Sequence, residues 1–219
     1  MLFAQLQRFT MTATSEHLAA FAPITWVIPY LTSPDWVVRD RNRGASPGED
    51  PDCFCHNTMR AYDGIQQWTE LYEKPPPQGK ITRTMSLCKF GPGLNGFPGI
   101  VHGGALLTLM DEALAYIMVA NETIEHGLEF IALDEKAWKQ LHAKGRPPQE
   151  VLKGRFVTAK LDIKFLSPVL CSGVVGIEVN ILENKAHKMT MRGIMRDGIG
   201  TPLLQADGLW VKIGGAPKL

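Results

Sequence analysis

The 219-residue sequence lacks any marked excess of charge of one sign. Its 23 Lys and Arg residues almost balance 22 Asp and Glu residues, and the formal net charge is +1. A protein whose main partner is nucleic acid generally carries a strongly basic face or stripe. The charge balance therefore predicts that nucleic acid is not the main partner of this chain.

Long apolar runs are also missing. The longest candidate, residues 105–120, is short for a bilayer span and is broken by Asp111 and Glu112, so we expect a soluble protein without a membrane span. Residues 1–23 contain a single arginine, Arg8, and lack the basic start and small-residue cleavage site of a secretory signal. We expect a cytoplasmic location, with a mitochondrial one as the alternative because this stretch is rich in Ser and Thr.

Cysteine is scarce, and its four residues show no spacing typical of a disulfide framework, which fits a reducing compartment. Cys53, Cys55 and His56 lie close together in the sequence, but no second cluster completes a tetrahedral metal site. We therefore expect neither a metal nor another cofactor. The hydrophobic content of 45% is that of an ordinary globular protein with one sizeable core.

Glycine and proline are abundant just before the most apolar segment of the chain. Residues 91–99, GPGLNGFPG, form a loop composition that lets the backbone turn sharply and approach another group closely. Residues 105–120 are then almost all apolar and compatible with a helix, which predicts a helix buried nearly all round. Asp111 and Glu112 interrupt this helix, and an ionised carboxylate in apolar surroundings requires a partner or access to water.

The start of the predicted helix is suited to a negative charge. The amides of Gly103 and Gly104, which follow His102, are expected among the first N–H groups without an intrahelical partner, at the positive end of the helix dipole. At helical spacing Gly104, Thr108 and Asp111 share one face, along which a ligand could lie. We therefore expect the Asp111 carboxylate to face the same small cavity as these amides, although such residues alone more often form only a tight turn.

The run GPGLNGFPGIVHGGALLTLMDEA (91–113) resembles the loop and central helix of hotdog-fold acyl-CoA thioesterases, in which HGG is followed within the helix by a catalytic acid at the position of Asp111. It is most similar to the mitochondrial acyl-CoA thioesterase branch of that superfamily. The resemblance implies hydrolysis of an acyl thioester of coenzyme A or of an acyl carrier. It also implies a homodimer or larger homo-oligomer, with joined sheets and sites that lie between subunits.

The resemblance also gives roles to individual residues. Asp111 would either attack the acyl carbon or deprotonate water, and the sequence does not separate these two mechanisms. The N–H group of Gly103 is the leading oxyanion donor, with the N–H group of Gly104 beside it. His102 and Asn95 could orient the thioester carbonyl.

Thr158 matches the strand position from which a hydroxyl residue positions the attacking water in this family. Alternation along the strand places Val157 and Ala159 on the core face and Thr158 on the opposite face, so Thr158 could serve a site formed with another subunit. An ordinary surface threonine is the alternative. Lys160 is a candidate for binding the phosphates of coenzyme A. Five further cations are equal candidates, and all could simply be solvated: Lys164, Lys185, Lys188, Arg192 and Arg196.

These patterns predict an α+β protein with a hotdog fold, an antiparallel sheet wrapped around a central helix, preceded by an N-terminal extension. Residues 1–57 are expected to form an arm over the main domain or a partner subunit, and residues 58–219 the hotdog domain. Within the arm, Ser15 is the expected N-cap of a short helix, and residues 39–52 are expected to form an exposed loop. Residues 122–153 are expected to form an insertion, which either shapes substrate access or decorates the surface.

The expected elements follow from the periodicity of apolar residues. The spacing of Ile65, Trp68, Leu71 and Tyr72 predicts an amphipathic helix over residues 57–74. A short helix is expected within the insertion, at 134–143. Period-two patterns and turn residues predict strands, with these ranges: 81–90, 157–165, 174–182, 188–196 and 202–213.

Two other functions remain open. A hotdog protein could dehydrate or cyclise a carrier-bound intermediate, although a hydratase-type site would arrange an Asp and a His differently from HGG and Asp111. The chain could also bind an acyl thioester without catalysis. The intact donor loop and acid argue against a silent protein, although the fold alone would not.

Overall fold

The main sheet of the computed structural model has seven antiparallel strands in the order β1-β2-β3-β7-β8-β9-β6. The structure describes residues 12–41, 53–77, 79–126, 143–147, 150 and 152–214. The strand bounds are β1 Trp36–Asp40, β2 Ile65–Glu73, β3 Arg83–Phe90, β6 Phe156–Phe165, β7 Gly173–Lys185, β8 Lys188–Arg196 and β9 Pro202–Lys212. The predicted strands around residues 81–90 and after residue 156 are thereby confirmed.

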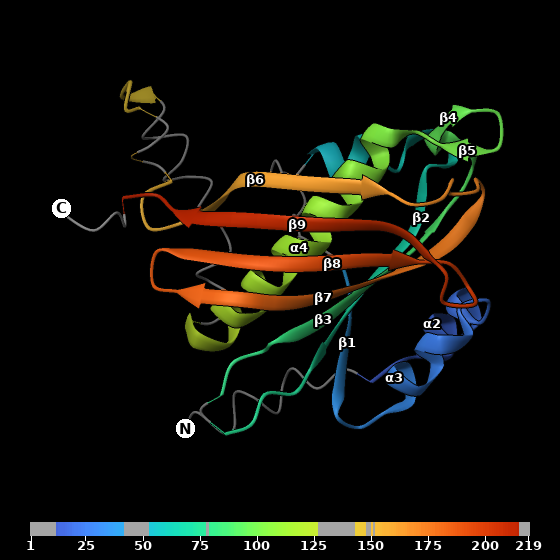
Figure 1. Ribbon diagram of the computed structural model, residues 1–219, viewed down its shortest axis with the longest axis horizontal. Helices are drawn as coiled ribbons and strands as arrows, with labels where there is room; N and C mark the ends of the chain where they lie inside the picture. The colour runs from blue at the N-terminus through green and yellow to red at the C-terminus, as the bar shows by residue number, and fades with distance from the viewer. Residues whose placement is uncertain are drawn as a thin grey trace.

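One long helix, α4 (Gly103–His126), lies against the concave face of this sheet (Figure 1). Its residues Leu109, Met110, Leu114 and Ile117 are fully buried, because the inward side chains of the strands cover them. The helix is long and apolar enough to cross a membrane by composition, a test that the core helix of a globular domain also passes. The arrangement confirms the predicted α+β hotdog fold.

Short strands and single helical turns precede this helix in the chain. A small hairpin of β4 (Asn95–Phe97) and β5 (Ile100–Val101) lies directly before α4. Three single turns also precede α4 in the chain: η3 Phe54–Thr58, η4 Ala61–Asp63 and η5 Pro92–Leu94.

Residues 65–73 form strand β2, so the helix predicted over residues 57–74 is wrong. Trp68 and Tyr72 pack into the core around α4, whereas Leu71 packs into a second core on the other face of the sheet. A strand buried on both faces shows no simple alternation, and a bulge between Ile65 and Gln67 disturbs its phase further. The aromatic and β-branched side chains of the segment favour a strand.

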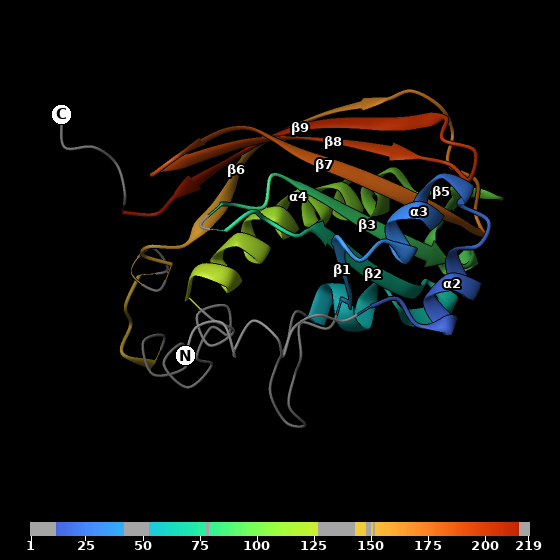
Figure 2. The ribbon, with the colours of Figure 1, turned by 90° about the horizontal axis from the view of Figure 1, so that it is seen from below.

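The N-terminal segment folds onto the outer face of the sheet (Figure 2). It comprises α2 (Ser15–Phe21), η2 (Thr25–Val27), α3 (Ile28–Thr32) and the edge strand β1. Its apolar side chains pack with those of β2 and β3 in a second core that includes Phe21, Leu31, Leu71, Met85 and Leu87. This arm is therefore fixed to the sheet through a continuous apolar contact.

Two details of the arm differ from the prediction. The N-cap of α2 is Thr14 rather than Ser15, since Thr14 and His17 cap each other's backbone amides in a capping box. The exposed loop predicted from residue 39 begins later, because Arg39 belongs to β1 and the side chain of Arg41 is only 8% exposed. The predicted insertion helix, 134–143, lies outside the described residues except at its last position.

Candidate functional site

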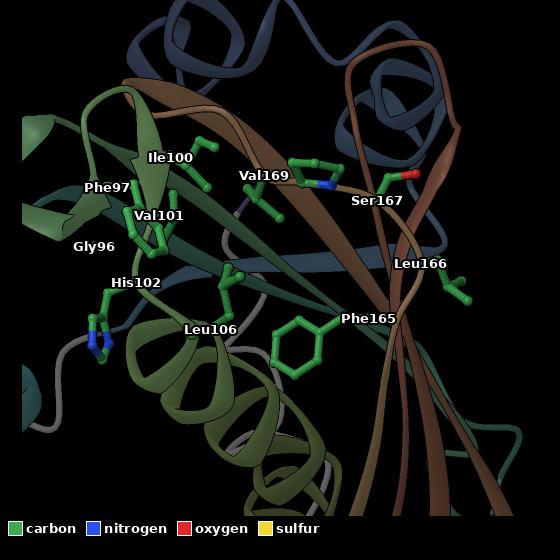
Figure 3. Close-up of a pocket in the computed structure, with 12 residues that line it drawn as sticks. Gly96, Phe97, Ile100, Val101, His102, Leu106, Phe165, Leu166, Ser167 and Val169 are labelled. Atoms are coloured by element: carbon green, nitrogen blue, oxygen red, sulfur yellow. The ribbon is translucent and has the colours of Figure 1, made fainter.

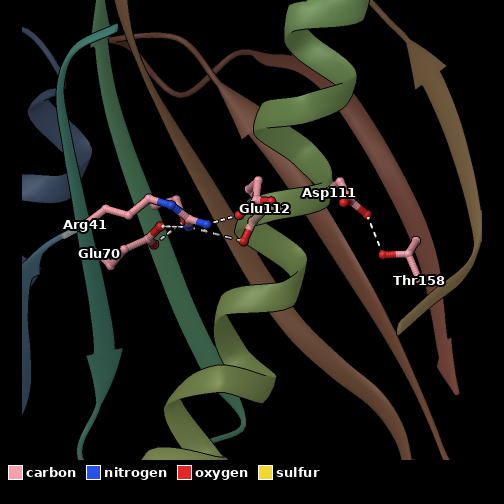
Figure 4. Close-up of polar contacts among 6 residues, drawn as sticks. Arg41, Glu70, Asp111, Glu112 and Thr158 are labelled. Atoms are coloured by element: carbon pink, nitrogen blue, oxygen red, sulfur yellow. Dashed lines mark hydrogen bonds and ion pairs between the residues drawn. The ribbon is translucent and has the colours of Figure 1, made fainter. Parts of the chain in front are cut away.

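The carboxylate of Asp111 and the hydroxyl of Thr158 meet between α4 and β6. Asp111 lies in the third turn of α4 and is half-buried, and Thr158 is exposed on β6. The Oγ1 atom of Thr158 donates to Oδ1 of Asp111 at 3.0 Å (Figure 4). The hydrogen bond holds the carboxylate in one orientation on a rigid element.

Thr158 reaches the helix because of a bulge in β6. Thr158 pairs with Trp210 and Lys160 pairs with the adjacent Leu209, so Ala159 is an extra residue between them. An extra residue reverses which side chains face the core. The predicted orientation of Thr158, away from the core of its own chain, is therefore wrong, and its contact with Asp111 is made within one chain.

Of the two amides predicted as oxyanion donors at the start of α4, one has no acceptor among the described residues. Nδ1 of His102 accepts a hydrogen bond from the Gly104 amide at 2.9 Å, so this predicted donor is already used. Among the described residues, none accepts from the amide of Gly103, which is the first residue of the helix. Because Nδ1 accepts, the neutral ring of His102 carries its proton on Nε2, where it can donate to a ligand.

Glycines bring His102 close to the helix start. A Cβ atom on Gly96 would lie 2.7 Å from Cα of His102, and one on Gly104 would lie 3.0 Å from its Nδ1. A side chain at Gly96 would require a shift of the loop backbone, whereas one at Gly104 would displace the His102 ring. The glycine-rich sequence therefore sets the position of the imidazole beside the Gly103 amide.

A cavity of about 560 Å³ opens beside this amide (Figure 3). Its walls are mainly apolar, and its polar groups are His102, Ser167 and backbone. Phe165 lies across from the helix start, with its Cζ atom 3.9 Å from where a Cβ atom on Gly103 would sit. The lining residues are Gly96, Phe97, Ile100, Val101, His102, Gly103, Leu106, Phe165, Leu166, Ser167, Pro168 and Val169.

Asp111 does not line this cavity, so the prediction of one cavity shared by the carboxylate and the amides is wrong within a single chain. Asp111 follows Gly103 by eight residues on the same helix, which corresponds to about 12 Å along the axis. The side chain of an aspartate is too short to span that distance. In one chain the Gly103 amide and the Asp111 carboxylate thus lie at separate places.

The remaining predicted residues take other positions. The hydroxyl of Thr108 donates to the backbone oxygen of Gly104 at 3.1 Å, within the helix. Asn95 is exposed on β4 and pairs with Val101 in the small hairpin, outside the cavity lining. The ammonium of Lys160 lies 2.7 Å from Asp162 on the solvent-exposed face of β6.

Sequence reasoning missed a charged cluster on the opposite flank of α4 (Figure 4). Nη1 of Arg41 lies 2.7 Å from Oε1 of Glu70, and its Nη2 pairs with Oε2 of Glu112. Ser86 donates to the other oxygen of Glu70, which is only 1% exposed. The guanidinium also lies 4.3 Å from the ring centroid of Trp68.

A signal for this cluster was present in the sequence. Glu70 lies between Trp68 and Leu71, large apolar residues that point to a core, and a carboxylate buried beside them requires a cation or hydrogen-bond donors. On an amphipathic helix Glu70 would lie on the polar face, where its carboxylate needs no partner, so the helix prediction did not indicate the cluster. Among the described residues, no group of three or more His, Cys, Asp or Glu side chains could hold a metal ion.

Comparison with known proteins finds a family model that matches the central part of the chain. The model of the Thioesterase superfamily matches residues 98–203, which include Gly103, Asp111 and Thr158. Verlamelin biosynthesis protein B from Lecanicillium sp is 25% identical over 126 residues, which cover 56% of this chain and 53% of that protein. The chain thus spans about half the length of this curated relative.

Solved structures that match this chain have low sequence identity to it. A hypothetical thioesterase protein from Streptococcus pneumoniae TIGR4, solved with coenzyme A, is 14% identical; the match covers 60% of this chain and 82% of that one, with a TM-score of 0.43. Zebra fish thioesterase superfamily member 2 is 12% identical, covering 63% and 79%, with a TM-score of 0.44. Residues 98–203 thus resemble the Thioesterase superfamily, and the structure around them has a hotdog fold.

Proposed function

We propose that this protein hydrolyses an acyl thioester of coenzyme A or of an acyl carrier. The observation that carries the proposal is the Asp111 carboxylate held by the Thr158 hydroxyl, inside the segment that matches the superfamily. A carboxylate fixed in this way can attack the acyl carbon or take a proton from water. The similarity of residues 91–113 to the mitochondrial acyl-CoA thioesterase branch favours coenzyme A as the carrier.

The Gly103 amide supplies the group that the developing negative charge requires. It lies at the positive end of α4 and opens into the cavity, where a thioester carbonyl would be held. Such a donor stabilises the oxyanion of the tetrahedral intermediate without reorganising during the reaction. Nε2 of His102 would donate from the side of the same cavity and orient the carbonyl.

The cavity favours an apolar acyl group. Its volume of about 560 Å³ lies within the range of small-molecule sites, which is roughly 300–1,000 Å³. No Asp, Glu, Lys or Arg residue belongs to its lining, and Phe97, Leu106 and Phe165 contribute apolar surface. An acyl chain with a charged end would lose its hydration there without gaining a partner.

We propose that two copies of the chain complete the site, because the donor and the carboxylate lie about 12 Å apart on one helix. An antiparallel pair of α4 helices would bring Gly103 of one copy toward Asp111 of the other. Strand β6 supports this arrangement, since it is the longer of the two edge strands, with 10 residues against 5 in β1, and a long open edge favours pairing. Exposed apolar residues lie at the end of β6, where Phe165 and Leu166 are 56% and 52% exposed, and on α4, where Leu107 is 40% exposed.

The proposal is tested with purified protein and a panel of acyl-CoA esters of different length, including aryl esters, by measuring the release of free thiol. Asp111→Asn should abolish turnover while the circular dichroism spectrum and the melting temperature stay close to those of the wild type. Asp207→Asn, which changes an acid on the sheet surface, should retain turnover. Wild-type turnover in Asp111→Asn, or no thioester cleaved by the wild type, would overturn the proposed function.

A further inference from the structure

The cluster of Arg41, Glu70 and Glu112 takes no part in the proposed chemistry, yet it joins three separate elements. Arg41 follows strand β1, Glu70 lies in β2 and Glu112 lies in α4. We propose that Arg41 is a positioning residue that sets the rotation of α4 about its axis and thereby directs Asp111 at Thr158. The inference rests on the proposed function, because it gives Arg41 an effect on hydrolysis through Asp111.

The helix couples the two flanks directly. Asp111 and Glu112 are neighbours in α4, so their side chains leave the axis about 100° apart and can change direction only together. Figure 4 shows their contacts on opposite sides of the helix, with Arg41 and Glu70 on one side and Thr158 on the other. Fixing Glu112 to Arg41 therefore fixes the direction in which Asp111 points.

Small rotations are sufficient to break the contact with Thr158. A side-chain oxygen about 5–6 Å from the helix axis moves by about 2 Å when the helix turns by about 20°. The Thr158 hydroxyl lies 3.0 Å from Asp111, so a displacement of that size away from it would take the pair outside hydrogen-bonding distance. A group that restrains rotation thus acts on the geometry of the carboxylate.

Arg41 is itself held firmly enough to serve as such a restraint. Its amide donates to the backbone oxygen of Trp68 at 2.9 Å, and its guanidinium lies over the Trp68 ring. The ion pair with Glu70 fixes the guanidinium to β2, and Ser86 of β3 fixes Glu70 in turn. The second ion pair, with Glu112, therefore connects α4 to a rigid part of the sheet.

The apolar core also resists rotation of α4, so the test must separate positioning from stability. Arg41→Met keeps much of the stem and removes the charge that bridges the two carboxylates. It should lower kcat for an acyl thioester about 10- to 100-fold and leave KM within about 2-fold, because the acyl cavity lies elsewhere. Arg41→Lys should recover part of the loss.

A control and a double variant discriminate the two roles. Arg83→Met removes another partly buried arginine, which pairs with Glu178 at 2.7 Å, and should change the melting temperature without changing kcat. In a Thr158→Val background, Arg41→Met should lower kcat by only about 2-fold, because the contact that Arg41 protects is already absent. An unchanged kcat in Arg41→Met, or a full loss in both backgrounds, would overturn the inference.

A crystal structure of Arg41→Met decides the point independently of hydrolysis. The inference predicts that Asp111 and Thr158 lie beyond hydrogen-bonding distance, whereas a retained contact near 3.0 Å overturns it. If Arg41→Met does not fold, Glu112→Gln is measured by the same criteria and should show a smaller change in the same direction. Failure of the wild type to cleave any thioester would refute the proposed function, while this structure would still decide whether Arg41 positions Asp111.

Discussion

Replacing Gly103 by proline removes one hydrogen-bond donor from the proposed site while preserving the helix. Gly103 is the first residue of α4, where proline is favoured because the missing N–H group has no intrahelical partner. An added Cβ atom has space, since its nearest neighbour is Cζ of Phe165 at 3.9 Å. The change therefore separates the loss of a donor from the loss of the fold.

Losing an oxyanion donor of this kind lowers kcat by about 10²- to 10³-fold, or about 2.7–4 kcal/mol in the barrier. Steady-state release of thiol from an acyl-CoA ester gives kcat, and circular dichroism reports the fold. Gly103→Ala is the matched control, because it adds a carbon atom at the same place and keeps the N–H group, and it should stay within about 3-fold of the wild type. Gly103→Pro with kcat as high as Gly103→Ala would refute the role of this amide.

Three further substitutions test the hydroxyl of Thr158, the close packing at Gly96 and the ion pair of Arg192 with Asp207. Thr158→Val removes a hydrogen bond to a carboxylate, a contact worth about 1.5–3 kcal/mol, and should lower kcat at least about 10-fold. Thr158→Ser keeps the hydroxyl and should retain most of the wild-type kcat. Equal kcat values for the two variants would contradict the role of the hydroxyl in holding Asp111. Gly96→Ala places a carbon atom 2.7 Å from Cα of His102. A crystal structure of this variant should therefore show a displaced loop, and kinetic measurements should show a lower kcat/KM. A loop that has not moved would contradict the claim that close packing at Gly96 positions His102. Arg192 holds the pKa of Asp207 below its usual range through a hydrogen bond. The pair therefore stabilises the fold above about pH 4, and this stabilisation is lost as the pH falls through the lowered pKa. The difference in melting temperature between wild type and Arg192→Met should shrink between about pH 5 and 2, and a constant difference would contradict this cause.

The parts of the fold that were predictable have simple periodicity. Strands β7, β8 and β9 each have one face on the core, so their alternating residues and the turns between them define the hairpins. Helix α4 was predictable from its apolar run, but the prediction that it is buried nearly all round is wrong, because the sheet covers one side and only 50% of the apolar window is buried. The glycine-rich loop before it was predictable because close backbone approach excludes other residue types.

The errors arise where a second surface or an extra residue disturbs that periodicity. Strand β2 is covered on both faces, which removed the alternation that would have identified it. The bulge at Ala159 reverses the phase of β6, which a sequence pattern of period two does not reveal. The position of Arg41 depends on contacts between segments distant in sequence, so its burial beside Glu112 could not be read from local composition.

The distance between Gly103 and Asp111 could be read from the sequence, because eight residues of one helix span about 12 Å, whereas the cavity beside Gly103 required the structure. Both predicted groups belong to one helix, and the sequence suggested that they share a cavity. Their separation of two helical turns places them in different environments of a single chain. The chemical roles can remain as predicted only if a second copy supplies the complementary half.

Mixed oligomers of two inactive variants test this central claim most directly. Asp111→Asn and Gly103→Pro are each expected to be nearly inactive alone, and their chains can be mixed by unfolding and refolding or by co-expression with different affinity tags. A mixed dimer contains one site that combines an intact Gly103 amide with an intact Asp111 carboxylate, so thioester hydrolysis should return to up to about half of the wild-type rate per dimer. Isolated mixed dimers that remain as inactive as the parent variants would contradict a site shared between two chains.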